Sequence, residues 1–191
     1  MQPDADADDG FEIRPRSSLE AAQRVLALAA VVDRVYEDPP TRVRTWVNTN
    51  KIAQHFSAEE RAFFFSDAIT EKQRVQFSWR TEALGTLLWA LSAMKRMPSL
   101  NEKVNLSKIE MVQDVILRTS DFLRDAVLRS DDEIHALEES MCDAHWLVRD
   151  AQINGKKLPP KTNPGIVQER RHATCWLIGL GETWDDVPTD T

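Results

Sequence analysis

The chain has 191 residues, of which 42% are hydrophobic and 29% are charged, the composition of one soluble globular domain rather than a collagen-like, disulfide-rich or largely disordered chain. Its formal net charge is −7, but residues 1–12 hold five acids and residues 182–191 hold four, with no Lys or Arg in either stretch. The remaining residues 13–181 therefore carry a net charge of +2, which argues against a nucleic-acid-binding protein.

The elements predicted along the chain are all helical. Residues 1–13 are rich in Asp and Ala and are predicted to be a disordered acidic tail, ahead of a single helical domain over residues 14–191. Helices are predicted at residues 18–37, 41–48, 58–67, 71–94, 108–118, 120–129, 131–153 and 165–180. No stretch alternates apolar and polar residues as a strand does. The expected fold class is therefore all-α, a multi-helix bundle-like domain with acidic tails.

Helix starts carry a repeated signal, a Ser followed three residues later by a Glu. The four pairs are Ser17 with Glu20, Ser57 with Glu60, Ser107 with Glu110, and Ser130 with Glu133. In such a capping box the Ser side chain accepts a hydrogen bond from a free backbone N–H, and the Glu side chain reaches back to the cap. Residues 154–164, with one Gly, three Pro and three Lys, are predicted to form an exposed loop.

Cysteine content and the N-terminus bear on the compartment. Cys142 and Cys175 are too few for a disulfide framework or a four-thiolate zinc site, so we expect reduced thiols in the cytoplasm. The N-terminus is acidic where a secretory signal is basic. The longest apolar run, Val25 to Val32, is much shorter than the roughly 18 residues that span a bilayer. The sequence therefore predicts neither export nor membrane insertion.

Charged residues fall on helix faces that should be buried. The run 78–91 is apolar around most of its circumference, which is typical of a helix at the centre of a bundle. At about 100° per residue, Arg80 lies within the apolar arc and Glu82 lies beside Trp89. These two side chains point about 160° apart on the helix, so they cannot pair with each other. Each needs a partner from another element, because an unpaired buried charge is costly.

Two other helices repeat this pattern, and two interpretations stay open. Glu169 and Arg170 lie in the apolar arc of the last helix, and His145 lies in the buried stripe of the helix from residue 131. One interpretation is a structural ion-pair network, with Arg80 paired to a carboxylate such as Asp150 or Glu169. The other is a polar pocket in which arginines bind an anionic group and His145 moves a proton. The arginines of that pocket are Arg80, Arg149 and Arg170.

The remaining motifs give no specific chemistry. Glu138, Cys142 and His145 share one helical face, but without a paired Cys or a His-Glu-x-x-His pattern we expect no metal, and no sequence feature indicates a cofactor. The C-terminal residues Trp184 and Val187 offer apolar area, so this segment is expected to dock on the bundle. Its acids, Asp185 or Asp186, are then expected near Arg170 or Arg171.

Four blocks in a fixed order resemble a known bacterial family, domain of unknown function 4272. The blocks are residues 78–84 (SWRTEAL) running into 88–91 (LWAL), residues 145–151 (HWLVRDA), residues 169–171 (ERR), and residues 184–191 (WDDVPTDT). The resemblance covers about residues 14–191 and implies a small bacterial protein with one helical domain. The family brings no established activity, so the resemblance assigns no catalytic residue.

The function expected from the sequence is a non-catalytic interaction or ligand-binding domain. Its unknown partner is a protein or a small anionic ligand, with neither nucleic acid nor membrane expected. The candidate binding residues are Arg80, Glu82, Arg149, Asp150, Glu169 and Arg170. The first alternative is an enzyme acting on a small anionic substrate, with His145 as acid or base and arginines stabilising charge. The second is an immunity-type acidic partner of a basic bacterial effector, suggested by the acidic tails.

Overall fold

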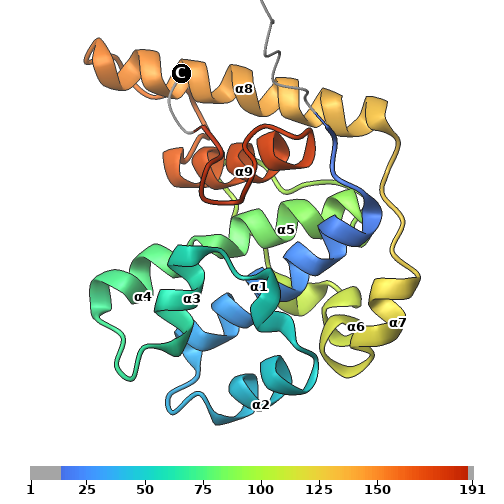
Figure 1. Ribbon diagram of the computed structural model, residues 1–191. Coiled ribbons are helices and arrows are strands. Elements are labelled where there is room, and N and C mark those ends of the chain that lie inside the picture. Colours follow the sequence, from blue (N-terminus) through green and yellow to red (C-terminus); the bar gives the residue numbers. More distant parts are fainter. Residues whose placement is uncertain (1–13, 189–191) are drawn as a thin grey trace, which may run out of the picture.

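The computed structural model describes residues 14–188, and within this range every regular element is a helix (Figure 1). The α-helices are α1 (Ser18–Tyr36), α2 (Thr41–Thr49), α3 (Ala58–Phe65), α4 (Glu71–Ser78), α5 (Arg80–Ala90), α6 (Met111–Leu117), α7 (Thr119–Arg124), α8 (Asp131–Ile153) and α9 (Pro164–Leu177). Two short 3₁₀ helices are η1 (Ile52–His55) and η2 (Leu106–Lys108). The predicted all-α class is confirmed, while the predicted tail, residues 1–13, lies outside the described range.

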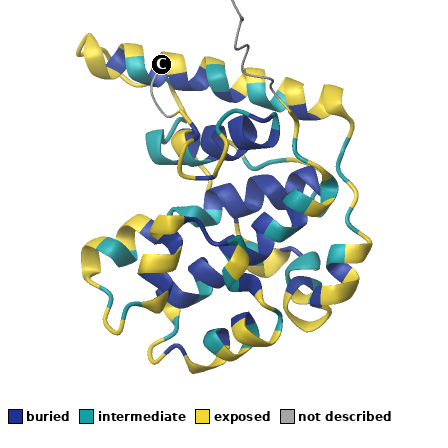
Figure 2. Ribbon diagram, in the orientation of Figure 1, coloured by how far each residue is buried: buried dark blue, intermediate teal, exposed yellow. Residues whose placement is uncertain are grey.

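The centre of the fold is formed by α1 and α5. Every residue from Glu82 to Ala90 is buried, which confirms that the run around α5 is a central helix. Helix α1 packs along α5, and its apolar positions between residues 21 and 35 are nearly all buried (Figure 2). Each large aliphatic side chain removed from water in this way contributes roughly 1.5 to 3 kcal/mol. Burial of these side chains is therefore a major stabilising contribution at the centre of the fold.

Two further helices form successive layers between the core and one edge of the molecule. Helix α9 packs on α5, and α8 packs on the other side of α9, so α8 forms an outer layer (Figure 1). The buried positions of α8 face α9, and its opposite face is exposed (Figure 2). Helices α2, α3, α4 and α7 also contact α1, and they lie on the side of the core away from α8 (Figure 1). No helix within residues 14–188 is long and apolar enough to cross a membrane.

Three of the four predicted capping boxes are present. They begin α1 at Ser17, α3 at Ser57 and α8 at Ser130. The box predicted at Ser107 is wrong, because Ser107 lies inside η2 and donates its backbone N–H to the side chain of Asn105. A further box, between Thr70 and Gln73 at the start of α4, was not predicted because its residues are Thr and Gln rather than Ser and Glu.

Several predicted helices are shorter in the structure. The single helix predicted at 71–94 is wrong: α4 and α5 are separated at Trp79, whose backbone N–H bonds to Gln76 in a tighter turn. This turn takes the chain from the exposed α4 into the buried α5. Helix α9 ends at Leu177 rather than at residue 180, because Gly179 adopts a left-handed φ of 95° that a helix does not accommodate.

Candidate functional site

A buried ion pair joins α5 to α9. Arg170 Nη2 lies 2.9 Å and Nε 3.1 Å from Glu82 Oε2, and the two side chains are 1% and 2% exposed. The other oxygen of Glu82 accepts the backbone N–H of Val104 at 2.9 Å. Burial lowers the pKa of Arg170, and the nearby Glu82 opposes that shift. Both charges are thus held between two helices in a dry environment.

Arg170 also fixes the loop that precedes η2. Its guanidinium donates to the backbone carbonyls of Pro98 at 2.6 Å, Ser99 at 3.4 Å and Glu102 at 2.9 Å. Together with Glu82, these acceptors occupy the guanidinium N–H groups, so Arg170 has no donor aimed at a ligand. The arrangement is that of a structural anchor.

A second pair joins the same two helices. Arg80 Nη1 lies 3.1 Å from Glu169 Oε2 and 3.3 Å from Oε1, and each side chain is 13% exposed. Of the two carboxylates considered as partners of Arg80, Glu169 is therefore the one in contact. Burial raises the pKa of Glu169, and Arg80 opposes that shift. The two ion pairs hold α5 and α9 in one register.

A third pair, between Arg24 of α1 and Glu60 of α3, was not predicted from the sequence. Both side chains are buried, and Arg24 donates to Glu60 Oε2, which also accepts the N–H of Ser57 at 3.0 Å. A signal was available, because Arg24 lies between Ala21 and Leu28 on the apolar face of α1 at helical spacing. The same test that found Arg80 finds Arg24.

The α8 candidates do not join these pairs. Asp150, expected as a possible partner of Arg80, is exposed and instead accepts from Lys156 Nζ at 2.8 Å and from Asn154 at 2.7 Å. It lies on the outer face of α8, because a helix turns it away from the buried Val148 and Ala151. Arg149 is half-buried on this helix, and its Nε has no hydrogen-bond partner within residues 14–188.

His145 is buried where α8 packs on α9, as the predicted buried stripe of this helix requires. Its proposed role as acid or base stays a prediction. Burial raises the pKa of Cys175 to about 11, so that thiol is protonated at neutral pH and is not a ready nucleophile. Within the described range, no group of three or more His, Cys, Asp or Glu side chains is placed to hold a metal ion.

The segment after α9 folds back onto the domain, as predicted. Trp184 and Val187 are buried, and His172 Nε2 donates to the Trp184 carbonyl at 2.9 Å. The His172 and Trp184 ring centroids are 4.5 Å apart. Gly179 and Gly181 allow the return, with left-handed φ values of 95° and 84°. We call residues 179–188 the C-terminal segment.

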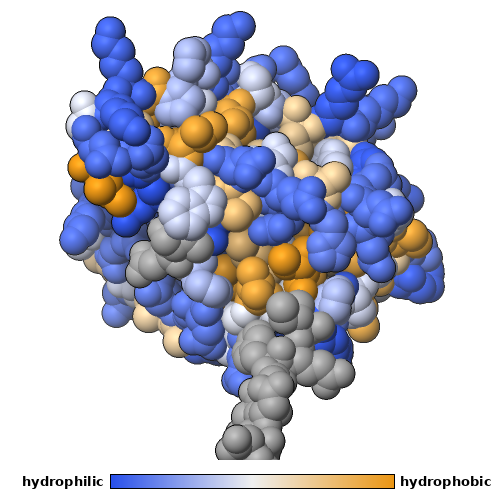
Figure 3. All heavy atoms as spheres, turned by 90° about the horizontal axis from the view of Figure 1, so that it is seen from above, coloured by the Kyte–Doolittle hydropathy of each residue, from blue (hydrophilic) through white to orange (hydrophobic). Residues whose placement is uncertain are grey.

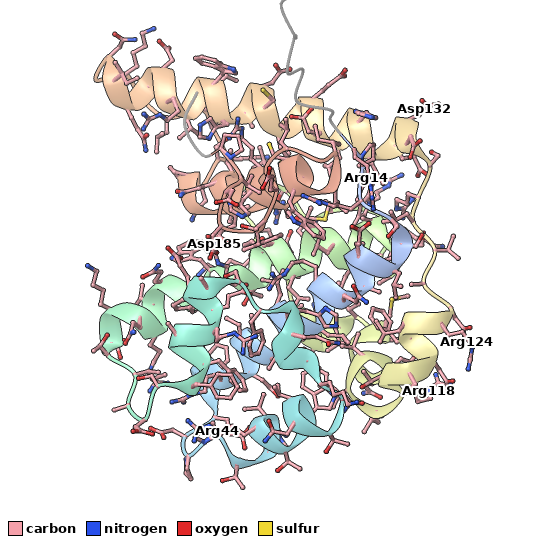
Figure 4. The ribbon with its side chains drawn as sticks, in the orientation of Figure 1. Arg14, Arg44, Arg118, Arg124, Asp132 and Asp185 are labelled. Atoms are coloured by element: carbon pink, nitrogen blue, oxygen red, sulfur yellow. The ribbon has the colours of Figure 1, made fainter. Side chains whose placement is uncertain are left out.

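The acids of the C-terminal segment have other partners than those predicted. Asp185 accepts the backbone N–H of Glu59 at the start of α3 at 3.2 Å (Figure 4). Asp186 accepts from Thr183 at 2.7 Å. The expected contacts with Arg170 or Arg171 are therefore wrong, because Arg170 is held in the core by Glu82 and Arg171 donates to the Pro188 carbonyl at 3.1 Å.

Docking of this segment leaves an open cavity of about 210 Å³, here called the C-terminal cavity. Its walls come from the start of α1, the turn from η1 into α3, helix α9 and the C-terminal segment. The lining residues are Arg16, Glu20, Gln23, Arg24, Gln54, His55, Phe56, Ser57, Trp176, Glu182, Thr183 and Trp184. Pockets for drug-sized ligands measure roughly 300 to 1,000 Å³. This cavity therefore suits a smaller molecule.

Arginine and tryptophan side chains alternate along one wall of the cavity. The Arg16 guanidinium carbon lies 5.1 Å from the centroid of the Trp176 ring, and that of Arg24 lies 4.8 Å from the Trp184 ring. The two tryptophan rings meet edge to face, with centroids 5.6 Å apart. Cation–π contacts of this kind contribute about 0.5 to 2 kcal/mol each. These contacts place the two guanidinium groups against the tryptophan rings of this wall.

Three buried polar atoms near this wall have no hydrogen-bond partner among the described residues. They are Arg24 Nε, Glu60 Oε1 and Trp184 Nε1. Buried polar atoms are nearly always paired, so a group of them calls for an explanation. None of the cavity residues was predicted to form a binding site, because they come from four separate segments and form no motif.

The cation Arg16 lacks a carboxylate partner within residues 14–188. Its hydrogen bonds go to the backbone carbonyls of Trp176 at 3.2 Å, Gly181 at 2.5 Å and Glu182 at 3.3 Å. Burial and the nearby Arg24 lower the pKa of His55, so this neighbour is neutral at neutral pH. The cavity wall therefore holds a positive charge that no acid of the wall pairs with directly.

The structure is that of a single all-helical domain in which buried ion pairs join the central helices and the C-terminal segment completes a small cavity. The chain belongs to the family described as domain of unknown function (DUF4272), whose model matches residues 7–187. This match confirms the resemblance found in the sequence. No curated protein and no solved structure matches the chain.

Proposed function

We propose that this protein is a cytoplasmic, non-catalytic ligand-binding domain that holds a small anionic ligand in the C-terminal cavity. The observation that carries the proposal is the Arg16 guanidinium, which lines the open cavity and is bound only by backbone carbonyls among the described residues. An anionic oxygen of a ligand would form a strong, charge-assisted hydrogen bond with this group.

The charges around the cavity favour an anion. Arg16 is bound only by backbone carbonyls among the described residues, so its positive charge is available to a ligand. Glu20 also lines the cavity, but its carboxylate accepts from Ser17 at 2.6 Å and from Arg14 at 3.2 Å. Ligand oxygens near Arg16 would thus meet an uncompensated cation, whereas the charge of Arg24 is balanced by Glu60.

The residues first considered for binding are better explained as supports. Arg80 and Arg170 are already paired with Glu169 and Glu82, and neither arginine lines the C-terminal cavity. We propose that these pairs fix α9, which carries Trp176 into the cavity wall. The enzyme alternative gains nothing from this cavity, because His145 is not among the residues that line it.

The test is thermal unfolding of the full chain with phosphate and with small mono- and dicarboxylates. A ligand present at 100 times its Kd stabilises the folded state by about 2.7 kcal/mol, which raises the Tm of a chain of this length by several degrees. Arg16→Gln should abolish the rise. The matched control is Arg118→Gln, whose side chain follows the end of α6, is exposed and is ion-paired to Asp114. No rise with any anion, or equal rises in both variants, would refute the proposal.

A second candidate function, binding a basic protein partner, is favoured by the outer face of α8. Its exposed large hydrophobic side chains are Trp146, Leu147 and Ile153, at 52%, 57% and 71% exposure. Exposed acids of the same helix include Asp132, Glu139 and Asp143. Figure 3, viewed from the α8 side, shows hydrophobic patches among hydrophilic side chains. A basic amphipathic helix would complement both properties, and Trp146→Ala should weaken binding of a Leu/Lys helical peptide without affecting anion binding.

A further inference from the structure

The C-terminal cavity is lined by charges of both signs. Arg16 and Arg24 lie on the wall formed with the tryptophans, and the carboxylates of Glu20 and Glu182 line the same 210 Å³ space. A simple anion would use Arg16 but would be repelled by the Glu182 carboxylate. A ligand that carries both charges would use Arg16 and Glu182, because Glu20 is already paired with Arg14 and Arg24 with Glu60. The acids are therefore informative about the chemical class of the ligand.

The cationic side of the cavity fits a carboxylate. A carboxylate has two oxygens and about four acceptor positions, which it fills with N–H donors. Arg16 supplies such donors, because its guanidinium is partly exposed, lies over the Trp176 ring and binds only backbone carbonyls among residues 14–188. Arg24 is closed off from solvent and is already paired with Glu60. A ligand carboxylate in the cavity would therefore meet Arg16.

The opposite charge belongs to Glu182 at the rim. Its side chain is exposed, and its carboxylate forms no ion pair or hydrogen bond with another described residue. Only its backbone carbonyl is engaged, by Arg16. A ligand ammonium group has three donors and would find an acceptor there. The side-chain amides of Gln23 and Gln54 add further polar contacts along the same lining.

The aromatic lining supplies the third property. Phe56, Trp176 and Trp184 are each less than a tenth exposed, yet all three line the cavity. They offer ring surface to an apolar group and leave little room for a long one. The size and lining together favour one apolar side chain of modest length.

We infer that the ligand is a zwitterion, an α-amino acid with an apolar side chain, whose carboxylate meets Arg16 and whose ammonium meets Glu182. This inference rests on the proposed function and narrows it. The carboxylate provides the anionic contact, and the aromatic lining takes the side chain. The presence of Glu182 at the rim of an anion site then has a physical reason.

The experiment is calorimetric titration of the full chain at pH 7 with three probes of similar size. Leucine carries both charged groups, 4-methylpentanoate lacks the ammonium, and 3-methylbutylamine lacks the carboxylate. We expect leucine to bind at least about tenfold more tightly than either relative. Glu182→Gln should weaken leucine binding about tenfold and leave 4-methylpentanoate binding equal or stronger. The matched control is Glu110→Gln, an exposed acid just before α6 that lies outside the cavity lining, which should change neither.

The outcomes separate this inference from the proposed function. If 4-methylpentanoate binds as tightly as leucine, or if Glu182→Gln does not weaken leucine binding, the zwitterion is refuted and an anion site remains. If none of the three probes binds while phosphate or dicarboxylates raise the Tm through Arg16, the amino acid is refuted and the proposed function stands. If only 3-methylbutylamine binds, both are refuted.

Discussion

Replacing Arg170 with Met should be among the most destabilising single changes in this chain. Met keeps the apolar stem but removes the guanidinium, so Glu82 is left as a buried charge without its partner. The carbonyls of Pro98, Ser99 and Glu102 lose their donor at the same time. Removing one member of a buried ion pair costs about 3 to 5 kcal/mol, and we expect a loss of about 4 kcal/mol.

Urea unfolding followed by tryptophan fluorescence measures this loss. With an m value of about 2 to 3 kcal/mol per molar for a chain of this size, the midpoint should fall by about 1.5 M. Adding Glu82→Gln to the variant should recover at least about 1 kcal/mol, because the amide removes the stranded charge. It also keeps an oxygen that accepts the Val104 N–H. The exposed Arg118→Met is the control and should leave the midpoint unchanged.

A small effect would contradict the reasoning. If Arg170→Met unfolds within about 1 kcal/mol of the wild type, the guanidinium does not balance a buried charge. If the double variant is less stable than Arg170→Met alone, Glu82 is not left unpaired by the first change. Either result would show that the Arg170–Glu82 pair does not fix α9 on α5.

Three further predictions concern the C-terminal part of the chain. Trp184→Ala should cost about 3 to 5 kcal/mol in urea unfolding, and unprotected amides at residues 184–187 in wild-type hydrogen exchange would contradict docking of the segment. Burial lowers the pKa of His172 to about 4 from its ordinary 6.5, so the unfolded chain binds a proton that the folded chain does not. The stability of the wild type relative to His172→Gln should therefore increase by about 3 kcal/mol from pH 4 to pH 7. A stability difference that does not change with pH would exclude this effect. The raised pKa of Glu169 changes stability with pH in the opposite direction, but it does so equally in both proteins. The half-buried Cys142 should react with a thiol reagent in the native state, and Cys175 only on unfolding, as counted by absorbance.

Local signals predicted most of the helices, and their limits are physical. The bounds of α8 agree with the prediction because a capping box begins it and its apolar stripe is unbroken. The break at Trp79 was missed because no Gly or Pro marks it, and the apolar pattern continues across it. Periodicity also showed that Arg80 and Arg170 point inward. It did not identify their partners, since a helical arc gives a direction and not a neighbour.

The C-terminal cavity could not be predicted from helical periodicity either, because periodicity does not show which segments meet in the fold. Its walls combine residues from both ends of the described chain, and apart from Arg24, whose helical spacing places it on the apolar face of α1, no residue in them stands out by spacing or composition. The buried partner of Arg24, Glu60, was recognised only as part of a capping box. Only the folded chain places Glu60 against Arg24, whose guanidinium lies over the Trp184 ring.

The return of the C-terminal segment has a consequence for the order of events during synthesis. Arg16 and Trp176 meet although 160 positions separate them, and Trp184 comes eight residues later still. A growing chain on the ribosome therefore has every helix before it has the last wall of the cavity. A chain that stops before Trp184 lacks that wall. Binding of the proposed ligand would thus distinguish chains that include Trp184 from chains that stop before it, even where their helix content is the same.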